Sequence, residues 1–171
     1  IAKMFVELIN FVEKMLFFYS LHERQYIGLR TYTQESIYKR IIDSNRLQDF
    51  EDFLNKVDLN YKLVASTDAQ GQPAVAIKFP NQIVEFNQLA SSGMLALALF
   101  YYWFINIAEV RLLVIDEFDA FYHSKLSEKF VKLLIESDCQ VILTTHNTSV
   151  MTNELMRPDC YFRINGNGIT S

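Results

Sequence analysis

The sequence contains few residues that break or loosen a fold, because only five of its 171 residues are glycine and three are proline. Half of the residues are apolar, which is enough to bury a sizeable core. This composition excludes a disordered chain and favours one compact unit, typical of an intracellular, cytoplasmic domain. An excess of positive charge is also missing, since the net charge is −4 and the pI is about 5.4. A general nucleic-acid-binding surface is therefore excluded, although a local patch at Lys39 and Arg40 stays open.

Cysteine is scarce, and the two cysteines, Cys139 and Cys160, lack the spacing of a metal site. We expect both to be buried free thiols.

An uninterrupted apolar segment long enough to span a membrane is also missing, because four charged residues divide the apolar stretch from Ile1 to Ser20. Helical spacing of its apolar residues predicts a helix that packs in a core or, as the alternative, against another lobe or subunit. The inward residues would be Phe5, Leu8, Ile9, Val12, Met15 and Leu16.

Two acidic residues follow an apolar run at Leu112 to Glu117, Leu-Leu-Val-Ile-Asp-Glu. Such a run predicts a buried strand of a parallel sheet, whose C-terminal edge is where ligands bind. There Asp116 could hold Mg²⁺, directly or through water, and Glu117 could deprotonate an attacking water molecule. A surface turn after a core strand is the alternative for this motif alone.

A second apolar run, from Gln140 to Thr145, leads directly to His146. Between the two runs, Ser124 to Ser137 has the apolar spacing of a helix, which predicts a right-handed strand, helix, strand unit. The parallel arrangement would bring His146 to the edge that carries Asp116 and Glu117. An imidazole there could donate a hydrogen bond to a γ-phosphate or to the attacking water. Its alternative role is to end the strand.

Small residues precede a third element, an almost continuously apolar stretch from Leu95 to Ile107 that predicts a buried helix. Ser91, Ser92 and Gly93 would leave the backbone N–H groups at the helix start open to a phosphate. The same residues could instead serve only as a helix cap.

The order of these elements resembles the C-terminal lobe of an ABC-type ATPase head of the SMC, RecF and OLD-like group. Ala90-Ser-Ser-Gly-Met lies where that superfamily has Leu-Ser-Gly-Gly-Gln, with Ser91 at the signature serine and Gly93 at the second glycine. Asp116 and Glu117 match the Walker B pair, and His146 matches the switch histidine. Met94 replaces the usual polar signature residue, and one of the two glycines is missing.

The residues after the acids narrow the resemblance to the ATPases of bacterial abortive infection. Phe118-Asp-Ala-Phe-Tyr-His is similar to their Asp-Glu-x-Asp-x-x-Leu-His pattern. The match continues through Thr144-Thr-His-Asn-Thr to Arg157-Pro-Asp-Cys-Tyr-Phe, which is similar to their Arg-x-Asp-x-x-Phe stretch. This resemblance places Asp119 and His123 in the D-loop, which contacts the second head of a dimer. It implies ATP and Mg²⁺ as cofactors, with Asp116 as the Mg²⁺ residue.

A Gly-x-x-x-x-Gly-Lys-Ser/Thr loop is absent, and without it nothing in this sequence grips the β- and γ-phosphates. We expect the sequence to be the C-terminal part of a longer ATPase, whose other lobe lies elsewhere in the same polypeptide or in a separate chain. The resemblance implies a homodimer or higher oligomer of heads that controls a nuclease or toxin effector in antiphage defence. Nucleic acid would be reached through that partner. A RecF- or SMC-like repair ATPase and a non-hydrolysing, ATP-bound scaffold are the alternatives.

The predicted fold is α/β, with a mostly parallel sheet flanked by helices and a helical N-terminal insertion. Residues 1–60 would form the insertion or lid, and residues 61–171 the ATPase lobe. The insertion includes an amphipathic helix from Gln34 to Lys56. Strands at Tyr61 to Ser66 and Ala74 to Phe79 would form a hairpin, which leads to Ile83 and the signature loop. A strand at Tyr161 to Ile164 would end the fold.

Overall fold

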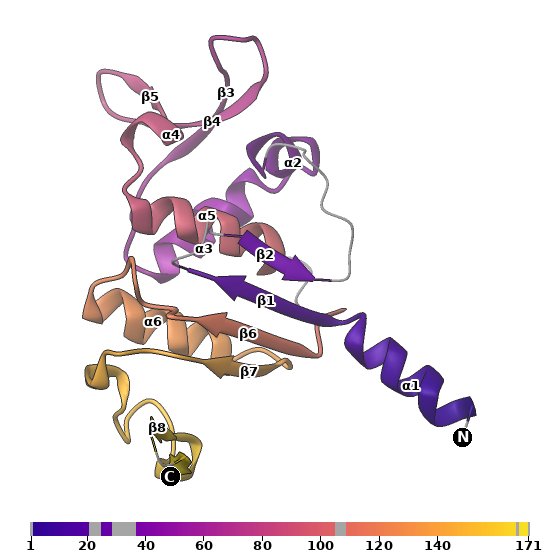
Figure 1. Ribbon diagram of the computed structural model, residues 1–171. Helices are drawn as coiled ribbons and strands as arrows, with labels where there is room; N and C mark the ends of the chain where they lie inside the picture. The colour runs from indigo at the N-terminus through magenta and orange to yellow at the C-terminus, as the bar shows by residue number, and fades with distance from the viewer. Residues whose placement is uncertain (1, 21–24, 29–36, 105–108, 167, 171) are drawn as a thin grey trace.

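The computed structural model describes residues 2–20, 25–28, 37–104, 109–166 and 168–170 (Figure 1). A four-stranded sheet, in the order β2-β1-β6-β7, forms its centre. Strands β1 (Met15–Tyr19), β6 (Leu112–Asp116) and β7 (Gln140–Leu143) are parallel. Strand β2 (Gln25–Gly28) pairs with β1 in the antiparallel direction. The predicted α/β class with a mostly parallel sheet is confirmed.

The two faces of this sheet differ in burial. Alternate residues of β1 and β6 are buried, among them Phe18 at 3 % exposure and its register partner Ile115 at 1 %. Residues on the opposite face are only half-buried, as Phe17 and Val114 show, or exposed, as Ile142 shows. Parallel sheets are normally covered on both faces, so one face of this sheet is unusually open among the described residues.

Two helices contribute to the core at the sheet. Helix α6 (Ser124–Ile135) is the predicted crossover between β6 and β7, and α5 (Ser92–Phe104) is the predicted apolar helix. Residues 105–107 of that prediction lie outside the described residues. The rings of Phe100 and Phe130 meet edge to face with centroids 4.6 Å apart, which joins α5 to α6.

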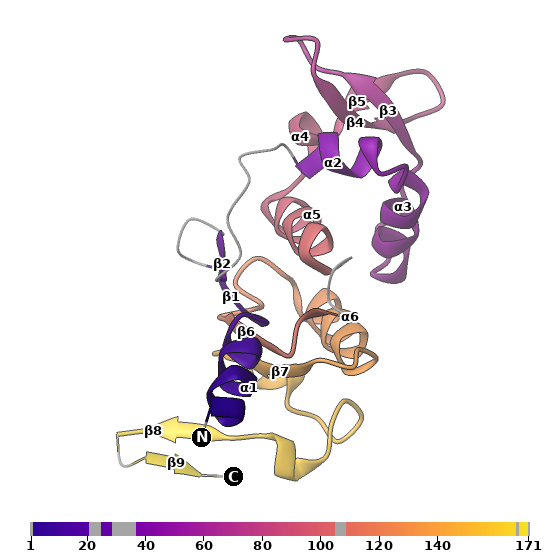
Figure 2. The ribbon, with the colours of Figure 1, turned by 90° about the vertical axis from the view of Figure 1, so that its right-hand side faces the viewer.

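A second, antiparallel sheet lies at one end of the molecule (Figure 2). It consists of β3 (Leu63–Thr67), β4 (Pro73–Lys78) and β5 (Ile83–Glu85), so the predicted hairpin is confirmed. The short helix α4 (Phe86–Leu89) leads from β5 to α5. The chain turns tightly between β3 and β4, where the Asp68 carboxylate accepts hydrogen bonds from the N–H groups of Gln70 and Gln72.

The predicted helix from Gln34 to Lys56 is two helices, α2 (Ile37–Asp43) and α3 (Leu47–Lys56), and residues 34–36 lie outside the described part. The break lies at Asn45, whose φ of 54° is left-handed and incompatible with a continuous helix. Apolar side chains of both helices still face inward, as Ile41 and Phe50 show at 1 % and 0 % exposure.

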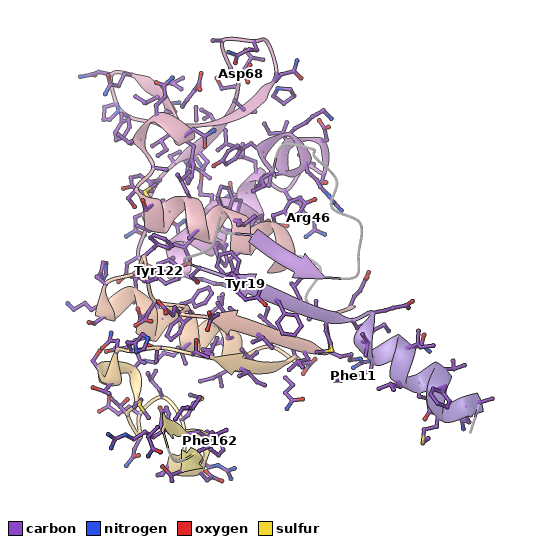
Figure 3. The ribbon with its side chains drawn as sticks, viewed as in Figure 1. Phe11, Tyr19, Arg46, Asp68, Tyr122 and Phe162 are labelled. Atoms are coloured by element: carbon purple, nitrogen blue, oxygen red, sulfur yellow. The ribbon has the colours of Figure 1, made fainter. Side chains whose placement is uncertain are left out.

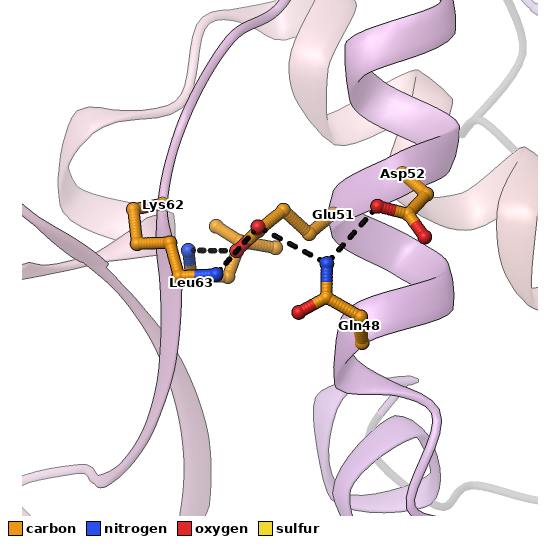
Figure 4. Close-up of polar contacts among 5 residues, drawn as sticks. All are labelled: Gln48, Glu51, Asp52, Lys62 and Leu63. Carbon is orange, nitrogen blue, oxygen red and sulfur yellow. Dashed lines mark hydrogen bonds and ion pairs between the residues drawn. The ribbon is translucent and has the colours of Figure 1, made fainter.

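A buried carboxylate fixes α3 to β3 (Figure 4). Glu51 accepts hydrogen bonds from Lys62 Nζ at 2.8 Å, from the backbone N–H of Leu63 at 2.7 Å and from Gln48 Nε2 at 3.2 Å. Burial alone would raise the pKa of Glu51, but these hydrogen bonds favour the charged form and lower it below its usual range. The charge of Glu51 is therefore part of the folded structure.

The N-terminal prediction is wrong in two respects. The helix α1 covers only Ala2–Val12, and the chain from Met15 to Tyr19 is the strand β1. None of the α1 residues is buried, and its apolar side chains are exposed, including Phe5 at 55 % and Phe11 at 40 %. Figure 3 shows Phe11 on a helix that extends away from the body of the protein. No helix within the described ranges is long and apolar enough to span a membrane.

The chain after β7 runs through two short 3-10 helices, η2 (Thr148–Val150) and η3 (Pro158–Cys160). It ends in a hairpin of β8 (Arg163–Asn165) and β9 (Gly168–Thr170), and β8 begins two residues later than the strand predicted from Tyr161.

Both cysteines are free, as predicted, but neither is buried: Cys139 is partly exposed and Cys160 is exposed. The division at residue 60 stays a prediction, although β1 pairs with β6 across it.

Candidate functional site

The two Walker-type acids lie at the C-terminal end of β6. Asp116 is the last residue of the strand and is exposed, while Glu117 begins the turn that follows. The φ of Glu117 is 48°, a left-handed conformation that costs a non-glycine residue about 1–2 kcal/mol. Backbone hydrogen bonds link β6 and the turn to Thr144, the residue after β7. Thr144 N–H donates to Ile115 O at 3.0 Å, and Phe118 N–H donates to Thr144 O at 3.1 Å.

The hydroxyl of Thr144 joins the two acids. It donates to Asp116 Oδ1 at 2.6 Å, and it accepts the backbone N–H of Glu117 at 2.8 Å. A hydroxyl has one donor hydrogen and two lone pairs, so both bonds can form at once. One side chain directly after the neighbouring strand therefore fixes both the carboxylate of Asp116 and the backbone that carries Glu117.

The structure brings Glu117 and His146 together. His146 Nε2 lies 3.6 Å from Glu117 Oε1, close enough for an ion pair when the imidazole is protonated. The Glu117 side chain is 32 % exposed and that of His146 is 91 % exposed, so both can meet a ligand from solvent. This juxtaposition follows from the parallel pairing of β6 with β7, as the sequence predicts.

Asp119 and His123, the predicted dimer-contact residues, make hydrogen bonds within their own chain. Thr145 Oγ1 donates to Asp119 Oδ1 at 2.7 Å and accepts the N–H of Asn147 at 2.9 Å. His123 caps helix α6, because its Nδ1 accepts the N–H of Leu126 at 3.3 Å. Their role at a second head stays a prediction.

Aromatic side chains anchor the segment that joins β6 to α6. Phe118 is 2 % exposed and stacks on Phe130, with ring centroids 6.1 Å apart. Tyr122 lies 5.4 Å from the same ring, and Figure 3 shows it between α5 and α6. Burial raises the pKa of the Tyr122 phenol, which keeps it protonated. The segment that follows the acids is thus packed firmly against α6.

The predicted signature residues form the start of α5. Ser91 is exposed, and its Oγ accepts the N–H of Met94 at 3.3 Å, so it caps the helix. Ser92 is also exposed, but Gly93 is buried. A Cβ on Gly93 would lie 2.7 Å from the carbonyl oxygen of Phe121. The start of α5 therefore touches the segment that follows the acids, and only glycine allows this approach. Met94 is buried at 6 % exposure, which explains an apolar residue there.

The acids suit a Mg²⁺ ion that is held mainly by other groups. The described residues contain no cluster of three His, Cys, Asp or Glu side chains that could hold a metal ion. Mg²⁺ commonly binds one or two carboxylates, several water molecules and the phosphates of a nucleotide. Asp116 is exposed and its bond from Thr144 occupies only one lone pair, so its carboxylate can still bind the ion.

Sequence reasoning missed the two threonines that precede His146. The sequence places Thr144 and Thr145 at the end of a strand and within the family match, but it predicts no contact for either hydroxyl. In the structure each hydroxyl bonds an acid near the end of β6. The signal was present, because hydroxyl side chains stood at the C-terminal end of the strand expected beside the acids. For Gly93 the sequence predicts phosphate contact or a helix cap, and it does not reveal the packing against Phe121.

Residues 7–152 match the family described as "AAA domain, putative AbiEii toxin, Type IV TA system". This chain belongs to that family. The predicted resemblance to an ABC-type ATPase head agrees with this AAA family. No curated protein matches the chain.

Solved structures that are similar to this family member include three SMC head domains. The Pyrococcus furiosus head, bound to the C-terminal domain of ScpA, is 16 % identical with a TM-score of 0.48, over 67 % of this chain and 32 % of that chain. The Pyrococcus yayanosii head has the same identity and TM-score, over 67 % and 24 %. The Thermotoga maritima head is 22 % identical with a TM-score of 0.43, over 67 % and 43 %. This chain thus spans less than half the length of each.

Proposed function

We propose that this chain is the C-terminal lobe of an ATPase head that binds and hydrolyses ATP together with a lobe carrying the phosphate loop. The observation that carries the proposal is the meeting of Asp116, Glu117 and His146 at one edge of the sheet, with His146 Nε2 3.6 Å from Glu117 Oε1. Ligands of open α/β sheets bind at this edge. Membership of an AAA family supports nucleotide hydrolysis as the reaction.

In the proposed reaction, water attacks the γ-phosphorus and the bond between that phosphorus and the oxygen of ADP breaks. Glu117 accepts the proton of the water, and His146 donates a hydrogen bond to the γ-phosphate. Mg²⁺, held in part by Asp116, would offset the negative charge of the phosphates. Glu117 is partly shielded and held in one backbone conformation, which suits a base that must face one water molecule.

The wider role is part of the same proposal. Two heads bind ATP between them, and Ser91 and Gly93 of one head contact the nucleotide held by the other. Loss of the γ-phosphate then weakens this dimer, and the change in the dimer controls a protein effector, a nuclease or toxin of an antiphage system. The family description, which names a putative AbiEii toxin of a type IV TA system, supports this role over a repair ATPase.

The test is ATP turnover and ATP-dependent dimerisation of the protein that carries both this chain and the phosphate loop. We expect Glu117→Gln to reduce turnover by at least about 100-fold, because a water-activating base contributes on the order of 10²–10⁴. The nucleotide-bound dimer should persist or accumulate in this variant. Phosphate release measures turnover, and light scattering measures the dimer.

Glu154→Gln is a matched control, since Glu154 is exposed and distant in sequence from the turn. It should retain turnover. If the unmodified protein binds ATP and dimerises without hydrolysing ATP, the chain belongs to an ATP-bound scaffold and not to an ATPase. Equal turnover in Glu117→Gln and the unmodified protein would show that Glu117 is not the base that activates water.

A further inference from the structure

Two consecutive threonines after β7 bond two acids of the candidate site and the backbone on either side of its reacting groups. Thr144 bonds Asp116 and the backbone of Glu117, while Thr145 bonds Asp119 and the backbone N–H of Asn147. Thr145 therefore fixes the loop that carries His146, and Thr144 fixes the turn that carries Glu117. We call Thr144 and Thr145 the threonine pair.

We propose that the threonine pair positions the reacting groups, with Thr144 setting the Asp116 carboxylate and the Glu117 backbone and Thr145 setting the His146 loop. Neither residue needs to touch the nucleotide. This inference rests on the proposed function, because it assigns a role in that reaction to two residues to which the sequence analysis gives none.

The backbone of Glu117 shows why such positioning is required. A left-handed φ of 48° is unfavourable for glutamate, and it persists only where the surroundings hold it. Thr144 holds this conformation, because its hydroxyl oxygen accepts the N–H of Glu117 and its carbonyl oxygen accepts the N–H of Phe118. Without the hydroxyl, the Glu117 N–H loses its partner and the turn can relax to an ordinary φ. Such a change would swing the Glu117 side chain away from His146.

The hydroxyl also links the metal-binding acid to the base. Its hydrogen is directed at Asp116 Oδ1, so the remaining lone pairs of that carboxylate have a fixed direction. Loss of this bond should leave Asp116 free to rotate about its side chain, and the Mg²⁺ requirement of the reaction should rise. A residue that served only folding would change neither the Mg²⁺ requirement nor the rate per folded molecule.

The test compares Thr144→Val, which removes the hydroxyl at nearly equal size, with Thr144→Ser, which retains it. We expect kcat of Thr144→Val to fall roughly ten- to hundred-fold, the change that loss of a hydrogen bond to a charged group produces. The KM for ATP should change less than about twofold and the half-activating Mg²⁺ concentration should rise. Thr144→Ser should restore kcat to within about threefold. Thr145→Val should lower kcat without changing the Mg²⁺ requirement.

Thr67→Val is the matched control, because Thr67 is exposed at the end of β3. It should behave as the unmodified protein. Amide hydrogen exchange at Glu117 and Phe118 gives a second readout that does not need turnover, and Thr144→Val should accelerate it. Unchanged exchange, or unchanged kcat and Mg²⁺ requirement in an active protein, would overturn the inference. An inactive unmodified protein whose exchange still responds to Thr144→Val would refute the proposed ATPase but leave the positioning intact.

Discussion

Substitution of Gly93 by alanine tests the close approach of α5 to the segment after the acids. The added Cβ would lie 2.7 Å from the carbonyl oxygen of Phe121 and 3.5 Å from Cδ1 of Tyr122. The first contact is with backbone, so rotation of a side chain cannot relieve it. Either the start of α5 or the 118–123 segment must move, and overpacking of this kind costs about 1–3 kcal/mol.

Helix propensity opposes this cost, because alanine is favoured over glycine inside a helix by up to about 1 kcal/mol. Gly93 is in the first turn of α5, where this gain is smaller. The net loss in free energy of unfolding should therefore be about 1–2 kcal/mol, which lowers Tm by roughly 2–8 °C for a domain of this size. Thermal and urea unfolding measure it directly.

Gly166→Ala is the control for the general effect of an added methyl group, since no atom lies within 4 Å of a Cβ at Gly166 and its φ is ordinary. Its stability should stay within about 0.5 kcal/mol of the unmodified protein. A Gly93→Ala protein as stable as this control, or more stable, would show that α5 does not depend on the contact with Phe121.

Two further predictions concern the core. Phe130→Ala should cost about 3–5 kcal/mol, because this ring contacts Phe100 and Phe118, whereas the exposed Phe162→Ala should cost little in the same urea titration. Glu51→Gln should cost about 1–3 kcal/mol at neutral pH. Folding lowers the pKa of Glu51, so its stabilisation is present above the unfolded pKa and is lost as pH falls through the folded pKa. Unfolding titrations should show the difference between Glu51→Gln and the unmodified protein shrink below about pH 4.

The strands and helix of the candidate site could be predicted because their apolar patterns fit only one type of secondary structure each. Leu112 to Ile115 is apolar on both faces, which a central parallel strand requires, and the following helix repeats its apolar residues every three to four positions. Parallel pairing then brings His146 to Glu117 without any knowledge of side-chain geometry.

The N-terminal segment was mispredicted because its apolar pattern is ambiguous. Met15 and Leu16 continue the helical spacing of the residues before them, yet a short apolar run can equally form a buried strand. Pairing with β6 decides in favour of the strand, and that partner is about a hundred positions away in the sequence. The break at Asn45 was missed for a related reason, since only the left-handed φ shows that the amphipathic pattern belongs to two helices.

Contacts that depend on a single atom were outside the reach of sequence reasoning. A threonine near the end of a strand suggests a surface hydroxyl, and only the folded structure shows that the Thr144 hydroxyl lies 2.6 Å from Asp116 Oδ1. The glycine at position 93 fits both a phosphate site and a close contact, and the carbonyl of Phe121 reveals the second requirement.

The contact between Gly93 and Phe121 also gives the proposed function a physical route from one nucleotide to another. In a dimer of heads, the start of α5 would face the nucleotide of the second head, while the turn with Glu117 faces the nucleotide of its own head. A Cβ at Gly93 would lie 2.7 Å from the Phe121 carbonyl oxygen, so α5 has no room to move toward the segment after the acids without displacing it. Phe118, stacked on Phe130, prevents the turn from yielding into the core. A shift of α5 that follows nucleotide binding at one site should therefore reach the base at the other.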